Sequence, residues 1–97
     1  MRIIGRDRLD AFCARHADAR TWIEAWLHEV ETTSWAVPQD IRDRYASASF
    51  LADNIVIFNV KGNKYRLETL VAYNARTIVI RKVETHAEYS KANKRKK

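Results

Sequence analysis

Residues 58–67 read Phe-Asn-Val-Lys-Gly-Asn-Lys-Tyr-Arg-Leu, and this stretch decides how the chain folds. The residues 55–58 that lead into it are apolar and rich in β-branched side chains, as in a strand covered on both faces. Residues 65–73 then alternate between two faces, and Gly62-Asn63 between the two runs can adopt the positive φ angles of a tight hairpin. The stretch therefore predicts two antiparallel strands joined by a turn over residues 61–64.

The rest of the chain extends this hairpin into an α+β fold. A second turn at Asn74-Ala75 leads to a strand over residues 77–83, which completes a three-strand meander, and residues 1–4 predict an N-terminal strand. Helical spacing of apolar residues predicts one helix from about Arg6 and a second one with Asp18 as its N-cap. We expect an antiparallel or mixed sheet with two or three helices packed on one face.

The segment from residue 32 to 54 is harder to interpret. Pro38 is suited to the first turn of a short third helix, and residues 46–49 are small and polar, as in a loop. The second helix carries a tryptophan-rich stripe that suits either base stacking or packing on the sheet. Its continuity with aliphatic residues favours packing.

Composition and charge indicate one domain, residues 1–97, with a polyanionic partner. The chain is 46% apolar and 31% charged, and its formal net charge is +6. Residues 91–97 carry five positive charges and no acid, which predicts a flexible basic tail that binds an anion or only aids solubility. The single Cys13 fits a reducing compartment and lies on an apolar helical stripe. Without an apolar run of spanning length or a signal region, we expect a cytoplasmic protein and no membrane partner.

Thr85-His86-Ala87-Glu88 matches a helix capping box, the first part of a candidate site for chemistry. It places His86 in a first helical turn and Tyr89 on the same helix face, three residues later. Phosphate binds readily at such a helix start, and the helix dipole favours a neutral imidazole that can accept a proton. The alternative is a histidine that only forms local hydrogen bonds.

Cations around the predicted turn form the second part of the candidate site. Lys61 and Lys64 supply point charges there, and Arg66 can hold a phosphate through two parallel N–H bonds. With Glu68 as the one nearby acid, these cations call for an anion, although Arg66 could instead pair with Glu68 or Glu84.

Such a group suits RNA cleavage by the RNA's own 2′-hydroxyl. That reaction needs a base for the hydroxyl proton, an acid for the leaving 5′-oxygen and a cation that stabilises the negative charge of the phosphorane. The sequence has no metal-ligand spacing, no glycine-rich phosphate loop and no Ser-His-Asp arrangement, so we expect no metal and no cofactor. His16 and His28 fall on predicted helices away from this edge and are interpreted as incidental.

The two motifs, residues 58–67 and 85–89, resemble the HigB branch of the RelE/ParE toxin superfamily. The resemblance covers most of the chain, and both motifs occur in the expected order. It implies a compact sheet with helices on one side and an mRNA endoribonuclease that acts on messages in the ribosomal A site. It also implies a cognate helix-turn-helix antitoxin of the HigA type and a possible toxin–antitoxin complex on operator DNA.

The resemblance and the residue chemistry together give a set of candidate site residues. Arg66, Lys64, His86 and Tyr89 are the catalytic candidates, with the choice of base and acid between the last two left open. The substrate-binding candidates are Lys61, Asn59, Asn63, Arg81 and Lys82.

Three alternative functions stay open at this point. The chain could be a non-catalytic basic module that binds RNA or the ribosome, in which case binding weakens with salt and no RNA is cut. It could act on gyrase, as some members of the superfamily do. A purely DNA-bound regulatory partner is disfavoured, because no segment reads as a recognition helix.

Overall fold

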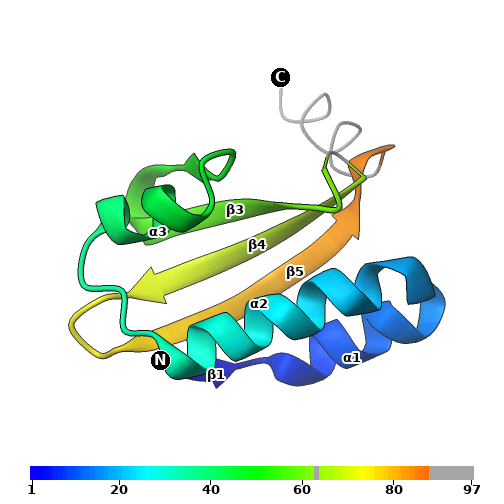
Figure 1. The fold of residues 1–97 in the computed structure, drawn as a ribbon, viewed down its shortest axis with the longest axis horizontal. Coiled ribbons are helices and arrows are strands. Elements are labelled where there is room, and N and C mark those ends of the chain that lie inside the picture. Colours follow the sequence, from blue (N-terminus) through cyan, green and yellow to red (C-terminus); the bar gives the residue numbers. More distant parts are fainter. Residues whose placement is uncertain (63, 88–97) are drawn as a thin grey trace.

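The computed structural model describes residues 1–62 and 64–87, which form a five-stranded sheet with helices on one face (Figure 1). A short strand and two helices come first, and a third helix and a two-residue strand lead into the long C-terminal strands. In chain order the elements are β1 (Arg2–Ile4), α1 (Arg6–Arg15), α2 (Arg20–Thr32), α3 (Pro38–Arg44), β2 (Ser49–Phe50), β3 (Ile55–Val60), β4 (Tyr65–Ala72) and β5 (Thr77–Thr85).

The strands are arranged in the order β1-β5-β4-β3-β2. The last three strands form the predicted antiparallel meander, and β1 joins the edge of β5 in parallel, so the sheet is mixed. Residues 46–49 were expected to form a loop, but Ser49 already belongs to β2, which pairs antiparallel with β3. The predicted α+β class and the meander are therefore confirmed, with one edge strand that the sequence did not indicate.

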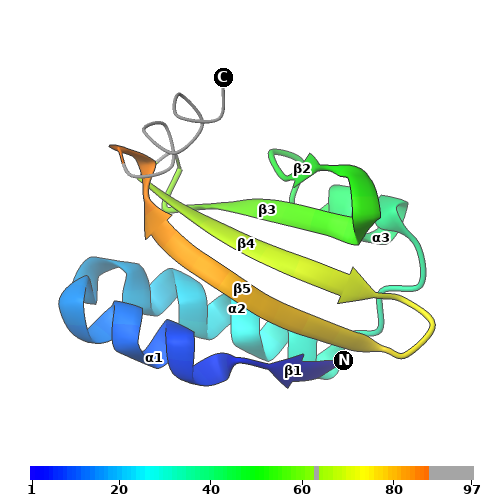
Figure 2. The ribbon, with the colours of Figure 1, turned by 180° about the vertical axis from the view of Figure 1, so that it is seen from behind.

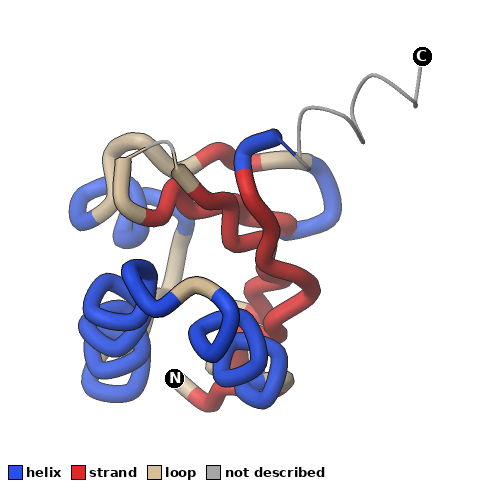
Figure 3. The backbone as a smooth tube through the Cα atoms, turned by 90° about the vertical axis from the view of Figure 1, so that its right-hand side faces the viewer, coloured by secondary structure: helices blue, strands red, loops and turns tan. Residues whose placement is uncertain are grey.

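All three helices lie on the same side of the sheet, which Figure 3 shows edge-on. The tryptophan-rich face of α2 is buried between helix and sheet: Trp26 is 1% exposed and its ring meets that of Phe58 edge-to-face, 5.3 Å between centroids. Packing, and not base stacking, is therefore the role of this stripe. Tyr65, Leu67, Thr69 and Val71 of β4 face this core, while the residues between them lie on the opposite face.

We call this opposite side of the sheet the open face. Seen from behind in Figure 2, β3, β4 and β5 cross it, and none of α1, α2 and α3 lies in front of them. Ile55 and Ile57 of β3 lie on this face and are buried there, at its end near β2. The open face is therefore apolar near β2 and polar toward the β3–β4 turn.

Gly5 lets the chain pass directly from β1 into α1 against β5. Its φ is +88°, and a Cβ atom at this position would lie 2.9 Å from the carbonyl oxygen of Ile80. β1 pairs with β5 only as far as Val79, after which α1 runs beside β5 instead of a strand. The second half of β5 thus has a helix for its outer neighbour.

Two backbone irregularities shape the polar end of the sheet. The β3–β4 turn spans residues 61–64 as predicted, but positive φ is found at Lys61 and Gly62, and Asn63 lies outside the described residues. A β-bulge in β5 shifts the β4–β5 register, so that Glu68 pairs with Lys82 while Thr69 pairs with Ile80. Such bulges redirect side chains, here those of Arg81 and Lys82. In the described part of the chain, no helix is long and apolar enough to cross a membrane.

Candidate functional site

The residues that the sequence singled out gather at the end of the sheet that carries the β3–β4 turn. Arg66 of β4 lies between two directly opposed neighbours, Asn59 of β3 and Glu84 of β5. Opposed residues of a sheet point to the same face, so all three side chains emerge on the open face. All three are half-buried. The sequence predicted a phosphate-binding arginine here, and the register gives that arginine an amide on one side and a carboxylate on the other.

Two acids on this face form ion pairs with the cations of the bulged strand. Arg81 Nε lies 3.4 Å from Glu68 Oε2, and Lys82 Nζ lies 3.7 Å from Glu84 Oε1. Both cationic side chains are nearly half exposed, whereas the two acids are 18% and 17% exposed, and ion pairs with one side in solvent contribute little to stability. An incoming phosphate could therefore compete for Arg81 and Lys82.

Lys64 lies at the same end but turns toward the helices. Its ammonium group forms an ion pair with Asp18, and the hydroxyl of Tyr65 donates a hydrogen bond to the other oxygen of the same carboxylate, 2.6 Å away. The interpretation of the turn as a group of cations with one nearby acid was thus incomplete. Asp18 is a second acid, contributed by the connection between α1 and α2.

Asp18 does not have the role that the sequence predicted for it. α2 begins at Arg20 and its N-terminus has no side-chain cap, so the prediction of Asp18 as N-cap is wrong. The hydrogen bonds from Lys64 and Tyr65 lower the pKa of Asp18 to about 2, and the Asp18 carboxylate raises the pKa of both donors. The three groups are therefore held as carboxylate, ammonium and neutral phenol at neutral pH.

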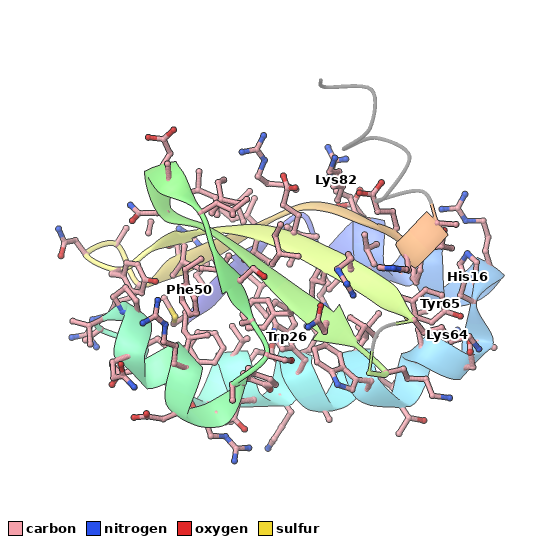
Figure 4. All side chains as sticks on the ribbon, turned by 90° about the horizontal axis from the view of Figure 1, so that it is seen from above. His16, Trp26, Phe50, Lys64, Tyr65 and Lys82 are labelled. Carbon is pink, nitrogen blue, oxygen red and sulfur yellow. The ribbon has the colours of Figure 1, made fainter. Side chains whose placement is uncertain are left out.

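His16 belongs to the same cluster, which corrects its interpretation as incidental. Its ring stacks on Phe12 with 4.4 Å between centroids and lies 5.3 Å from the ring of Tyr65 (Figure 4). We call His16, Asp18, Lys64 and Tyr65 the turn cluster. One sequence signal could have found it: Tyr65 falls on the inward-facing stripe of β4, and a buried phenol needs a hydrogen-bond partner from the covering helices. His28, in contrast, is exposed on α2.

His86 follows the last residue of β5, beside the turn. Its backbone N–H donates to the carbonyl oxygen of Lys64 at 3.0 Å, which ties the end of β5 to the start of β4. His86 is exposed, and Thr85 directly before it ends the strand, as expected of an N-cap position. Glu88, the last residue of the predicted capping box, and Tyr89, the second proton-transfer candidate, lie outside the described residues.

The site thus has two sides. On or beside the open face lie Arg66, Asn59, Arg81 and Lys82. Lys64 is directed to the turn cluster on the helical side, and Lys61 is exposed in the turn between the two sides. Within residues 1–62 and 64–87, no three His, Cys, Asp or Glu side chains are close enough to hold a metal ion. The described groups include a half-buried guanidinium, further cations around it and an exposed imidazole, and groups of these kinds can hold an anion and transfer protons.

The comparisons with known proteins identify one family. The HigB_toxin family, described as the RelE-like toxic component of a toxin–antitoxin system, matches residues 19–92. The match includes α2, all the strands from β2 to β5, and both sequence motifs. A comparison with curated proteins gave no match.

Proposed function

Because this chain belongs to the HigB toxin family, the RelE-like toxic component of toxin–antitoxin systems, we propose that it is an endoribonuclease that cuts mRNA in the ribosomal A site. A component of such a system has a cognate antitoxin as its partner. The specific antitoxin we propose is a helix-turn-helix protein of the HigA type, which also brings the toxin to operator DNA.

The observation that carries the proposal is the position of Arg66. It is the central residue of the Asn59–Arg66–Glu84 row on the open face, which none of the helices α1, α2 and α3 of the described residues covers. A guanidinium from a residue that lies between two neighbouring strands can bind two oxygens of one phosphate and stabilise the charge that develops as the 2′-hydroxyl attacks. A strand of RNA laid across the open face would bring one phosphodiester to this residue.

Proton transfer is the second requirement of the reaction. His86 is the described residue best suited to it, because it is exposed and lies next to the turn through its bond to Lys64. In our proposal His86 transfers a proton at one of two atoms, the attacking 2′-oxygen or the leaving 5′-oxygen. Tyr89 transfers the proton at the other of these two oxygens. These transfers and the guanidinium supply what 2′-hydroxyl attack needs, so the proposed reaction uses no metal ion.

Lys64 takes a positioning role in this proposal. Its ammonium is engaged by Asp18 on the helical side, so Lys64 fixes the turn beside Arg66 while the main-chain carbonyl of Lys64 fixes His86. In this proposal the RNA on either side of the cleaved bond contacts two residues of the turn and three of the strands. These are Lys61 and Asn63 in the turn, and Asn59, Arg81 and Lys82 on the strands.

Primer extension on cellular messages tests the proposal. Brief expression of the wild-type chain should create new 5′ ends inside translated regions, and Arg66→Ala should remove them. Arg2→Ala is the matched control, because Arg2 is an exposed arginine at the other end of β5. Growth arrest without new RNA ends would contradict the proposal and favour a gyrase target or a non-catalytic RNA-binding role.

A further inference from the structure

A basic groove lies between α1 and the bulged half of β5, beside the site described above. Its volume is about 250 Å³, and it is lined by Arg8, Ala11, Arg15, Lys82 and Val83. None of these lining residues is acidic. Three of the five carry a positive charge, so the groove is suited to an anionic group.

The fold creates the groove for identifiable reasons. Gly5 ends β1 beside Val79 and Ile80, and α1 then takes the place of a strand next to the remainder of β5. Arg8, Ala11 and Arg15 follow one another at helical spacing and thus share one face of α1. The small side chain of Ala11 between two long ones leaves the space open, and the backbone positions of Arg8 and Arg15 lie seven residues, or about 10 Å, apart along the helix axis.

The two arginines of the groove differ in their ion pairing from Lys82, which lines the same groove. Arg6, Arg44, Lys64, Arg81 and Lys82 all form ion pairs with acids. In the described part of the chain no ion pair involves Arg8 or Arg15, although Asp7 and Asp10 lie on the same helix. Lys82 has one acidic partner, the half-buried Glu84, with 3.7 Å between Nζ and Oε1. The groove therefore holds positive charge that the described protein does not balance.

The groove adjoins the face that carries Arg66. Arg66 pairs with Glu84, and Glu68 pairs with Lys82, so Lys82 is the diagonal neighbour of Arg66 on β5. Diagonal neighbours of this kind lie about 7–8 Å apart. A polyanion that places one charge at Arg66 can thus place the following charges in the groove.

We propose that the groove binds backbone phosphates of the RNA strand that flank the phosphodiester held by Arg66. This inference rests on the proposed function, because it takes RNA as the substrate. Arg8 and Arg15 bind successive phosphates through their paired N–H groups, and Lys82 exchanges Glu84 for phosphate at the border between groove and open face. The groove supplies affinity for the strand and takes no part in bond cleavage.

The test measures salt-dependent binding to a single-stranded 2′-O-methyl RNA of about ten nucleotides, a length that basic strand-binding grooves cover. This probe carries the backbone phosphates but cannot be cut by 2′-hydroxyl attack. Fluorescence anisotropy compares the wild-type chain with Arg8→Gln/Arg15→Gln. The control is Arg2→Gln/Arg42→Gln, which removes the same charge from the other end of the sheet and from α3. Residues 91–97 are the same in all three proteins.

Each phosphate contact contributes about 0.7 to the slope of log affinity against log salt. The groove variant should therefore lose about 1.4 from the wild-type slope, and each single variant about half of that, while the control keeps the slope. The inference is overturned if groove variant and control have equal slopes, or if the wild-type chain does not bind the probe at low salt. It is also overturned if the groove substitutions weaken binding of polyglutamate but not of RNA.

The two proposals fail in different assays. If the groove variant loses the expected slope while the wild-type chain cuts no message, the groove inference stands and the endonuclease proposal fails. If messages are cut but the slope is unchanged, the reverse holds.

Discussion

Gly5→Ala is the substitution whose cost can be worked out most directly from the structure. Gly5 has φ +88°, a left-handed conformation that costs a residue with a Cβ about 1–2 kcal/mol. The new Cβ would lie 2.9 Å from the Ile80 carbonyl oxygen and 3.3 Å from the Ile80 Cβ. Backbone atoms of a central strand cannot move aside easily, so overpacking adds about 1–3 kcal/mol. We expect a loss of about 2–5 kcal/mol in the free energy of unfolding.

Gly62→Ala is the matched control for this prediction. Gly62 also has a positive φ, +68°, but a Cβ atom at this position would have no atom of the described residues within 4 Å. The variant should therefore lose only the backbone contribution, about 1–2 kcal/mol. Urea unfolding of the two variants measures the difference. Equal losses, or a larger loss for Gly62→Ala, would refute the argument that the close approach of Gly5 to β5 sets where β1 ends and α1 begins.

Two further predictions concern titrating groups. The pKa of Asp18 in the folded protein is about 2, below its ordinary 3.8, so the interactions of Asp18 stabilise the fold above pH 3.8 and are lost as the pH falls toward 2. Asp18→Asn should flatten the pH dependence of the unfolding free energy in that window and lower the pKa of Tyr65 in a spectrophotometric titration; an unchanged Tyr65 titration would contradict the hydrogen bond. Burial raises the pKa of the Cys13 thiol, which is 4% exposed. A thiol reagent should therefore modify Cys13 at the rate of unfolding, and rapid modification of the native protein would contradict its burial.

The fold was largely predictable because its signals are local. The alternation from Tyr65 to Ala72, the turn after Val60 and the helical stripe around Trp26 each depend on neighbouring residues, and the structure has all of them. β2 was missed because two residues, Ser49 and Phe50, are too few to show a period.

The candidate site was only partly predictable, since its contacts join distant parts of the chain. Asp18 was interpreted through its nearest neighbours as an N-cap, but its partners are Lys64 and Tyr65, more than forty residues away. The sequence predicted a strand over residues 1–4, but it could not show that this strand pairs with β5 and leaves α1 beside the rest of β5, which creates the groove at Arg8. The pairing of Asn59 with Arg66, in contrast, follows from the turn length, because the turn fixes the register of β3 and β4. The position of Glu84 beside Arg66 depends also on the β-bulge in β5.

The central claim is that Arg66 holds the RNA phosphate that is attacked by the neighbouring 2′-hydroxyl. A purified translation system with one defined message tests it, with the single-turnover rate of cleavage measured for the wild-type chain and for Arg66→Ala. We predict products that end in a 2′,3′-cyclic phosphate, no cleavage when the attacked nucleotide carries a 2′-O-methyl group, and a rate about 10²–10³ lower for a folded Arg66→Ala protein. Cleavage that persists on the 2′-O-methyl message, or at the full rate without Arg66, would contradict the account.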